Sequence, residues 1–206
     1  MQFDPTGREP RETYRFLNGG IVPRPIAWVS SQDHNGTNNL APFSFFNGVA
    51  SNPPSLSISI THTEERPAGH KDTLHNILEL GEFVVNIVSE TTAAAMVETS
   101  ANFLAEVDEF HIAGVTPAQS TRVRPPRVAE SPVSFECKLH DTMQVGEGAG
   151  SSRLVVGVVL YIHIHDNILD EHGHIDIQRL QPVGRLGGNR YCTIRETFDL
   201  ARKTTT

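Results

Sequence analysis

The sequence has little of several features that would each assign it to a class of protein. Its 206 residues contain two cysteines, Cys137 and Cys192, which form no CxxC pair and are interpreted as buried apolar residues or stray thiols. No apolar run approaches the roughly 18 residues that cross a bilayer. Lys and Arg form no block and the formal net charge is −7, which argues against a nucleic-acid partner.

The N-terminal segment also lacks the features of a targeting signal. MQFDPTGREPRETYRF is polar and mixed in charge, without the apolar core of a secretory signal or the acid-poor, Arg-rich composition of a transit peptide. Apolar residues make up 38% of the chain and charged residues 20%, a composition typical of a folded globular protein. We therefore expect a cytoplasmic protein that does not enter a membrane.

Motifs of the common catalytic classes are missing as well. The chain contains no GxGxxG, P-loop, GxSxG or HExxH motif. Among its ten histidines, His163 and His165 lie two apart on an apolar strand and therefore face the same side, and His172 and His174 repeat the spacing in a predicted turn. A third ligand of matching geometry is not evident, so no metal site is predicted. The interpretation that remains is polar residues on a surface or interface, with His165 or His163 able to line a ligand pocket and His165 the catalytic candidate.

Hydrophobic periodicity predicts a mainly β protein. The signals are a strand at 26–29, a hairpin turn at Asn35-Gly36, and Leu and Ile alternating with serines at 55–61. Later strands are expected at 82–89, 133–145 and 154–166. A helix is predicted at 72–80, capped by Asp72 or Thr73 and ended by Gly81, and an Ala-rich helix at 90–99.

The remaining segments complete one predicted domain, 1–206. Residues 1–13 are expected to form an N-terminal arm, and 101–132 a long excursion with one short helix. Strands and helices do not alternate at βαβ spacing, so an antiparallel barrel with helical insertions is favoured over a doubly wound sheet.

One group of polar residues surrounds the start of the first predicted helix. The N-terminus of a helix favours a phosphate, and Lys71 adds a positive charge, Thr73 a hydroxyl donor and Arg66 a possible bidentate grip. The alternative is an ordinary helix start in which Asp72 caps the helix and the two cations are solvated. The charge of Asp72 opposes a phosphate unless its carboxylate turns towards the backbone or Lys71.

A second group lies in NNLAPFSFFNG, residues 38–48. Amide and hydroxyl groups of Asn39, Ser44 and Asn47 are interleaved with phenylalanines, and Pro42 fixes the chain locally. A flat heteroaromatic ligand needs apolar walls for its faces and polar groups for its edges. An aromatic core segment is the alternative interpretation.

Taken in order, several segments resemble the flavin reductase-like, FMN-binding split-barrel family, which includes flavoredoxin and the reductase components of two-component flavin monooxygenases. The resemblance runs from about residue 14 to 202. The segments are PRPIAWVSS (23–31), NNLAPFSFFNGVASNPPSLSISI (38–60), KDTLHNILELGEFVVNIVS (71–89), ESPVSFECKL (130–139), VVGVVLYIHIHDNIL (155–169) and PVGRLGGNRYCTI (182–194).

This resemblance implies a closed antiparallel split β-barrel of Greek-key type with helical insertions, forming a homodimer with FMN near the subunit interface. It places three groups of residues around the flavin: Trp28, Val29 and Ser30 at its border; Asn39, Ala41, Pro42, Ser44 and Phe45 along the ring and ribityl chain; Arg66, Lys71, Asp72 and Thr73 at the phosphate. His165, Arg185 and Tyr191 are further contributors by resemblance.

The implied activity is transfer of hydride from NADH or NADPH to flavin N5, with a flavin-dependent monooxygenase as the expected partner that receives reduced flavin. Such a reaction needs no acid–base triad, because the flavin carries the chemistry. The alternatives are a flavoredoxin-like electron carrier, an FMN enzyme that acts directly on an organic substrate, and a non-flavin metal enzyme that uses the histidines.

Overall fold

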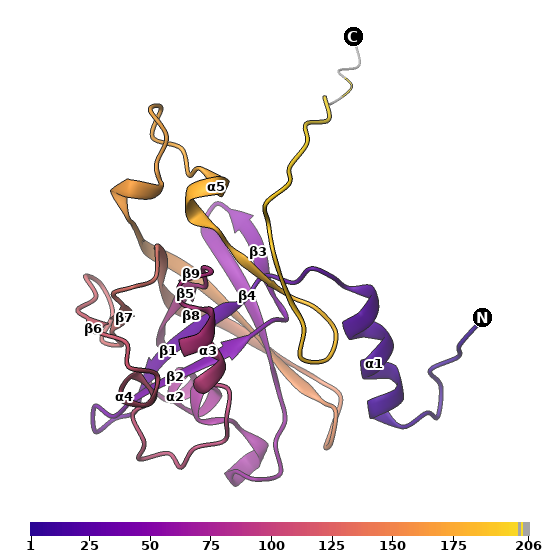
Figure 1. Cartoon of the computed structure of the whole chain (residues 1–206). Coiled ribbons are helices and arrows are strands. Elements are labelled where there is room, and N and C mark those ends of the chain that lie inside the picture. Colours follow the sequence, from indigo (N-terminus) through magenta and orange to yellow (C-terminus); the bar gives the residue numbers. More distant parts are fainter. Residues whose placement is uncertain (202, 204–206) are drawn as a thin grey trace.

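A seven-stranded antiparallel sheet forms the body of the molecule in the computed structural model, which describes residues 1–201 and 203 (Figure 1). Its strands run in the order β2-β1-β5-β8-β9-β4-β3. Their bounds are β1 Ala27–Gln32, β2 Asn38–Phe43, β3 Phe46–Ser51, β4 Pro54–Thr61, β5 Glu82–Ile87, β8 Val133–Val145 and β9 Ser152–Ile164. The strands predicted from periodicity are confirmed. The 38–48 segment, which carries Pro42 and Ser44, divides between two strands.

The two edges of this sheet meet where β2 passes into β3. These strands lie at opposite ends of the strand order, yet only Ser44 and Phe45 separate them in the chain. The sheet must therefore curl until its edges are neighbours at this corner, where the Ser59 N–H of β4 donates to the Phe45 carbonyl at 2.8 Å. Across the described residues no β2–β3 ladder closes the barrel. An antiparallel, mainly β architecture is confirmed, whereas the predicted closure is not.

Strand β1 divides the core into two clusters because it is buried on both faces. Ala27 and Val29 pack with Phe83, Ile58 and other residues inside the curled sheet. Ile26 and Trp28 point the other way, towards Met96, Phe110 and Val183. Alternation along a strand sends neighbours to opposite faces, so one strand serves both clusters.

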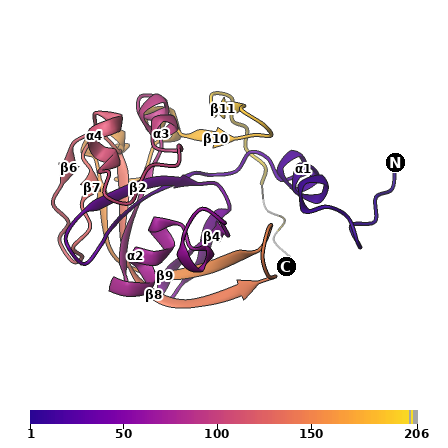
Figure 2. The same cartoon turned by 90° about the horizontal axis from the view of Figure 1, so that it is seen from below.

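Helix α2 (Asp72–Leu80) packs one face against the inner cluster of the curled sheet, while His75, Leu78 and Glu79 are exposed (Figure 2). Leu74 and Ile77 join the inner cluster, and Gly81 ends the helix in the left-handed conformation at φ 70°. The predicted bounds are confirmed. The predicted cap is wrong, because Lys71 occupies the cap position and no side chain caps the helix.

The other helices lie outside the sheet, and all of them except the N-terminal helix are short. The Ala-rich helix is α3 (Ala93–Glu98), and the excursion holds α4 (Glu109–Ala113) and the small β6–β7 pair. The remaining elements are η1 Pro67–Gly69, β6 Pro117–Ala118, β7 Arg127–Val128, η2 Asp166–Ile168, α5 Ile177–Leu180, β10 Val183–Arg185 and β11 Tyr191–Thr193.

Helix α1 (Pro10–Gly20) begins inside the segment predicted to be an arm (Figure 1). It buries no residue, and Tyr14 and Leu17 are about half exposed. Its apolar residues nevertheless fall at helical spacing and Pro10 stands at its start, so the prediction of an arm over 1–13 is wrong from Pro10 onwards. Of the helices in the described residues, none has the length and apolar character needed to cross a membrane.

Candidate functional site

Two adjoining hollows lie along the outer side of β2. The first is bordered by β2, the start of α2 and the 99–109 segment; the second by the end of β2, helix α1 and the β10–β11 hairpin. They share Pro42, Phe43, Lys71 and Ser100, so together they form one elongated groove. Of the predicted site residues, the first hollow contains Asn39, Ala41, Pro42, Arg66, Lys71, Asp72 and Thr73, and the second contains Pro42, Ser44, Lys71, Arg185 and Tyr191.

The start of α2 presents hydrogen-bond donors to the first hollow. Its first-turn N–H groups have no partner within the helix, and no side chain caps them. Lys71 at the cap position holds its Nζ 5.9 Å from the centre of the Phe43 ring and makes no ion pair with any described residue. A helix N-terminus with an adjacent unpaired cation is suited to a phosphate.

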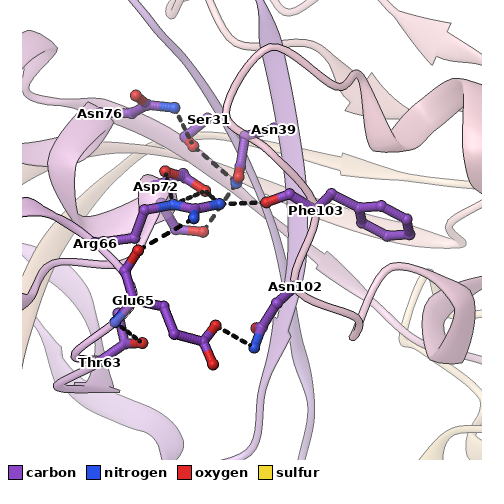
Figure 3. A network of polar contacts seen from close by, with 10 residues as sticks. Ser31, Asn39, Thr63, Glu65, Arg66, Asp72, Asn76, Asn102 and Phe103 are labelled. Carbon is purple, nitrogen blue, oxygen red and sulfur yellow. Dashed lines mark hydrogen bonds and ion pairs between the residues drawn. The ribbon is translucent and has the colours of Figure 1, made fainter.

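Arg66 and Asp72 form an ion pair at the edge of this hollow (Figure 3). Arg66 Nε donates to the two Asp72 oxygens at 2.9 and 3.1 Å, and Nη2 donates to Oδ2 at 3.0 Å and to the Phe103 carbonyl. The left-handed turn at Gly69, whose N–H donates to the Arg66 carbonyl at 3.1 Å, returns the chain to Asp72. Nε and Nη2 of the guanidinium are therefore engaged, whereas Nη1 donates only to the Glu65 carbonyl at 3.4 Å, and the contact of Arg66 with a phosphate stays a prediction. The pair also offsets part of the negative charge of Asp72, which weakens its opposition to an anion.

A network of side-chain hydrogen bonds holds the floor of the first hollow (Figure 3). Asn39 Nδ2 donates to Thr73 Oγ1 at 2.9 Å and to Ser31 Oγ at 3.3 Å. Asn76 Nδ2 donates to the same Ser31 oxygen at 3.2 Å. Since Thr73 Oγ1 accepts from Asn39, its own hydrogen is available to another acceptor.

Glu109 is a residue of the first hollow that the sequence did not indicate. It begins α4, is 6% exposed, and its Oε2 accepts from the Leu40 N–H of β2 at 2.9 Å. Burial, aided by the charges of Asp72 and Asp108, raises its pKa to about 7, although two backbone hydrogen bonds oppose the shift. It lies 36 positions from Thr73 in an irregular stretch, so no spacing pattern could connect it to α2.

The second hollow is bordered by arginines and an aromatic hairpin. Arg185 Nη1 donates to the Tyr191 hydroxyl, and its guanidinium carbon lies 4.6 Å from the centre of the Tyr191 ring. Arg24, from the PRP segment, also borders this hollow and donates Nε to Ser44 Oγ at 3.2 Å. Arg24 was not selected from the sequence, where it had no visible partner.

Five predicted site residues do not reach either hollow. Trp28, Val29 and Ser30 are fully buried in β1. Val29 packs in the inner cluster, and Trp28 faces the other cluster, where its Nε1 donates to Thr99 Oγ1, itself a lining residue, at 2.8 Å. Phe45 lies in a separate groove beneath α1, with its ring centre 6.3 Å from that of Tyr14. His165 precedes η2 and borders neither hollow.

His163 of β9 serves a different purpose. His163 Nε2 bonds to the buried carboxylate of Glu136 at 2.5 Å, and that carboxylate also accepts the Thr121 N–H at 2.7 Å. Burial alone would raise the pKa of Glu136, but hydrogen bonds from Thr121, His163 and Arg122 outweigh it and lower the pKa. Glu136 thereby fastens the excursion to the sheet, on an element that borders neither hollow.

The fold and the site define a class of protein. Its members have a split antiparallel barrel with an elongated groove, suited to a phosphate, along one edge strand. The chain belongs to the flavin reductase-like family: residues 19–181 match the family model described as flavin reductase like domain.

Solved structures of similar proteins agree with this assignment. Nitrilotriacetate monooxygenase component B from Bacillus cereus superposes with a TM-score of 0.91 at 35% identity, over 97% of this chain and 98% of its own. The 2-nitrobenzoate 2-nitroreductase NbaA from Pseudomonas fluorescens gives 0.86 at 31% identity, over 99% and 97%. A candidate flavin reductase with a split barrel domain from Shewanella frigidimarina gives 0.82 at 25% identity, over 98% and 100%.

Proposed function

We propose that the protein is an FMN-binding flavin reductase that uses NADH or NADPH and supplies reduced flavin to a partner oxygenase. One observation carries this proposal: the uncapped start of α2 and the unpaired Lys71 meet in a groove whose walls include Pro42 and Phe43. The similarity to nitrilotriacetate monooxygenase component B supports the supply of flavin to a partner.

The residues of the groove fit the parts of FMN. The α2 N–H groups, Lys71 Nζ and the Thr73 hydroxyl would hold the phosphate, with the Arg66–Asp72 pair fixing the turn beside them. Pro42 and Phe43 would face the ring, and Asn39 and Ser44 offer polar groups to its edges. When bound, the flavin supplies the hydride-accepting and electron-donating chemistry. The chain therefore has to orient the flavin and its electron donor and to exclude water.

An anaerobic titration tests the activity. The purified protein, reconstituted with FMN, should show flavin absorption bands that bleach on addition of NADH or NADPH. Bound flavin that ignores both nucleotides would exclude the reductase but keep the flavoprotein. A colourless protein that takes up no added FMN would exclude both.

Removing the phosphate-binding groups tests the orientation. Lys71→Ala combined with Thr73→Ala should weaken the binding of FMN by about tenfold or more, because a charge-assisted hydrogen bond and a hydroxyl donor are lost. Riboflavin, which has no phosphate, should bind almost as before in a fluorescence-quenching titration. Lys138→Ala, an exposed lysine on β8, is the matched control. Equal losses for FMN and riboflavin would contradict the assignment of the phosphate to α2.

Direct reduction of an organic substrate is a second candidate function. The second hollow is bordered by Arg24, Arg185 and Lys71, a cationic setting for an anionic substrate next to the flavin. The similarity to a nitroreductase whose substrate, 2-nitrobenzoate, carries a carboxylate supports this candidate. Bleached flavin that is reoxidised anaerobically by 2-nitrobenzoate would favour it over the supply of flavin to a partner.

We also propose that a single domain spans the chain. We propose further that the protein forms a homodimer through the end of β9. Leu160, Tyr161, Ile162 and Ile164 are each 37% to 46% exposed. In this stretch β9 pairs with β8 only, since the β4 partners end at Val158. Consecutive exposed apolar residues on a strand edge are typical of a surface that another subunit covers.

A further inference from the structure

The second hollow has an uneven balance of charge. Three cationic side chains border it, Arg24, Arg185 and Lys71, and the hollow as described includes no Asp or Glu. None of the three makes a salt bridge with an acidic side chain of the described residues. A chain with a net charge of −7 thus concentrates unopposed positive charge at one end of its groove.

Arg24 is the least accessible of these cations, at 4% exposed. It donates Nε to Ser44 Oγ at 3.2 Å, Nη1 to the carbonyls of Asn18 and Ile21 at 2.9 and 2.7 Å, and Nη2 to the Leu186 carbonyl at 3.1 Å. All four acceptors are neutral, and one of the five guanidinium N–H groups remains available. Burial lowers the pKa of Arg24, and the charge of Arg185 lowers it further against the opposing effect of Tyr14.

Arg24 and Arg185 also face each other directly across an antiparallel bridge. The Arg24 N–H donates to the Arg185 carbonyl at 3.0 Å, and the Arg185 N–H donates to the Arg24 carbonyl at 2.8 Å. Like charges at such a position repel one another, and an unpaired buried charge costs still more. A bound anion would remove both penalties.

Two hydroxyl groups complete a set of donors around the same space. Ser44 Oγ accepts from Arg24 and Tyr191 Oη accepts from Arg185, so each retains its own hydrogen to donate. Pro42, Phe43 and Lys71 border both hollows, but Asp72 and Thr73 of α2 line only the first hollow, whereas Ser44 and Tyr191 line only the second. A ligand whose phosphate lies at α2 therefore leaves these donors for a different group.

We propose that the second hollow binds an oxyanion, a carboxylate or a phosphate, carried by the substrate that exchanges electrons with the flavin. The identity of that substrate rests on the proposed function, whereas the oxyanion site itself does not. Arg185, Tyr191 and Ser44 contact the anion, and Arg24 supplies charge from behind while it fixes the 18–24 segment.

Binding of two non-reacting probes to the flavin-free protein tests the site. Benzoate presents a carboxylate and NADP⁺ presents phosphates, and each is followed by the rise in Tm with concentration. The wild type should bind at least one of them saturably. Arg185→Gln should weaken that probe by about tenfold or more, Arg185→Lys should recover part of the affinity, and Arg190→Gln, an exposed arginine of the same hairpin loop, should have no effect.

The probes distinguish the sources of the oxyanion. Loss of benzoate alone in Arg185→Gln identifies an organic carboxylate, and loss of NADP⁺ alone identifies the phosphate of a nicotinamide donor. Wild-type protein that binds neither probe, or Arg185→Gln protein that binds both unchanged, would overturn the proposal. So would an Arg185→Gln variant that loses FMN but keeps riboflavin, because the hollow would then hold the phosphate of the flavin itself. Because the probes are added to flavin-free protein, failure of FMN binding would leave this test intact.

Discussion

Glu109 couples proton binding to folding, because its carboxyl is buried against the edge of β2. Its pKa in the folded protein is about 7, raised by burial above its ordinary value of 4.5. The folded state therefore binds a proton that the unfolded state has released between these values. The resulting stabilisation is complete below about pH 4.5 and is lost as the pH rises through about 7.

We predict that Glu109→Gln removes this dependence. The amide keeps an oxygen for the Leu40 N–H but cannot ionise. Between pH 5 and pH 8 the free energy of unfolding of the wild type should therefore fall, relative to that of the variant, by an amount on the order of 2 kcal/mol, allowing for solvent screening at the hollow. Urea unfolding at a series of pH values measures it. Glu98→Gln, at an exposed position of α3, is the control, and parallel profiles for wild type and Glu109→Gln would contradict the shift.

Single residues were predictable from the sequence where the neighbours that define them are close in the chain. Lys71 and Thr73 could be located at the start of α2, because a helix start is a local feature, while their role at a phosphate stays a prediction. The partner of Asp72 was not, because Arg66 reaches it only through the turn at Gly69. Arg24 depends on acceptors as distant as Leu186, so its role is visible only in the folded chain.

Strand β9 carries a glycine that the packing of its neighbours requires. A Cβ at Gly157 would lie 2.5 Å from Phe83 Cζ and 3.3 Å from the Cys137 Cβ, both fully buried. Such distances are below van der Waals contact, so the aromatic ring would have to move within the inner cluster. The glycine thus permits β9 to cross over Phe83.

We predict that Gly157→Ala destabilises the fold by about 1–3 kcal/mol through overpacking. The measurement is the urea midpoint at constant m-value. Gly48→Ala on β3 is the matched control, since nothing lies within 4 Å of its added Cβ, and it should change stability by no more than about 0.5 kcal/mol. A Gly157→Ala protein as stable as wild type would show that the inner cluster is loosely packed.

Elements were predictable in proportion to how much of their pattern is local. Helix α2 has one apolar face and a terminal Gly81, and its predicted bounds match the structure. Helix α1 also has apolar residues at helical spacing and a proline at its start, so its pattern was present in the sequence and was missed. The division of 38–48 into β2 and β3 depends on each strand finding a partner at a different edge of the sheet, which the sequence does not specify.

At the scale of the whole molecule, the proposed dimer makes a prediction about β9. Ile162→Glu should weaken self-association by about one hundredfold or more, because a two-fold axis places the buried charge in the interface twice. Sedimentation or size-exclusion chromatography across a dilution series measures it. Val97→Glu, an equally exposed apolar position on α3, should leave association unchanged. A monomeric wild type, or a variant that still dimerises, would place the interface elsewhere or exclude it.

The two-residue connection at Ser44 and Phe45 couples the binding of a ligand to the local opening of the sheet between β2 and β3. The sheet's two free edges are held together here, and Pro42 and Ser44 at the same corner border the groove. Separation of the edges would expose the Ser59 N–H that donates to Phe45. A flavin bound across the corner should therefore slow deuterium uptake at Ser59 and along β2 and β3, while uptake in α5, which lines neither hollow, stays unchanged. A bound flavin would then stabilise the fold against local opening in addition to supplying the redox chemistry.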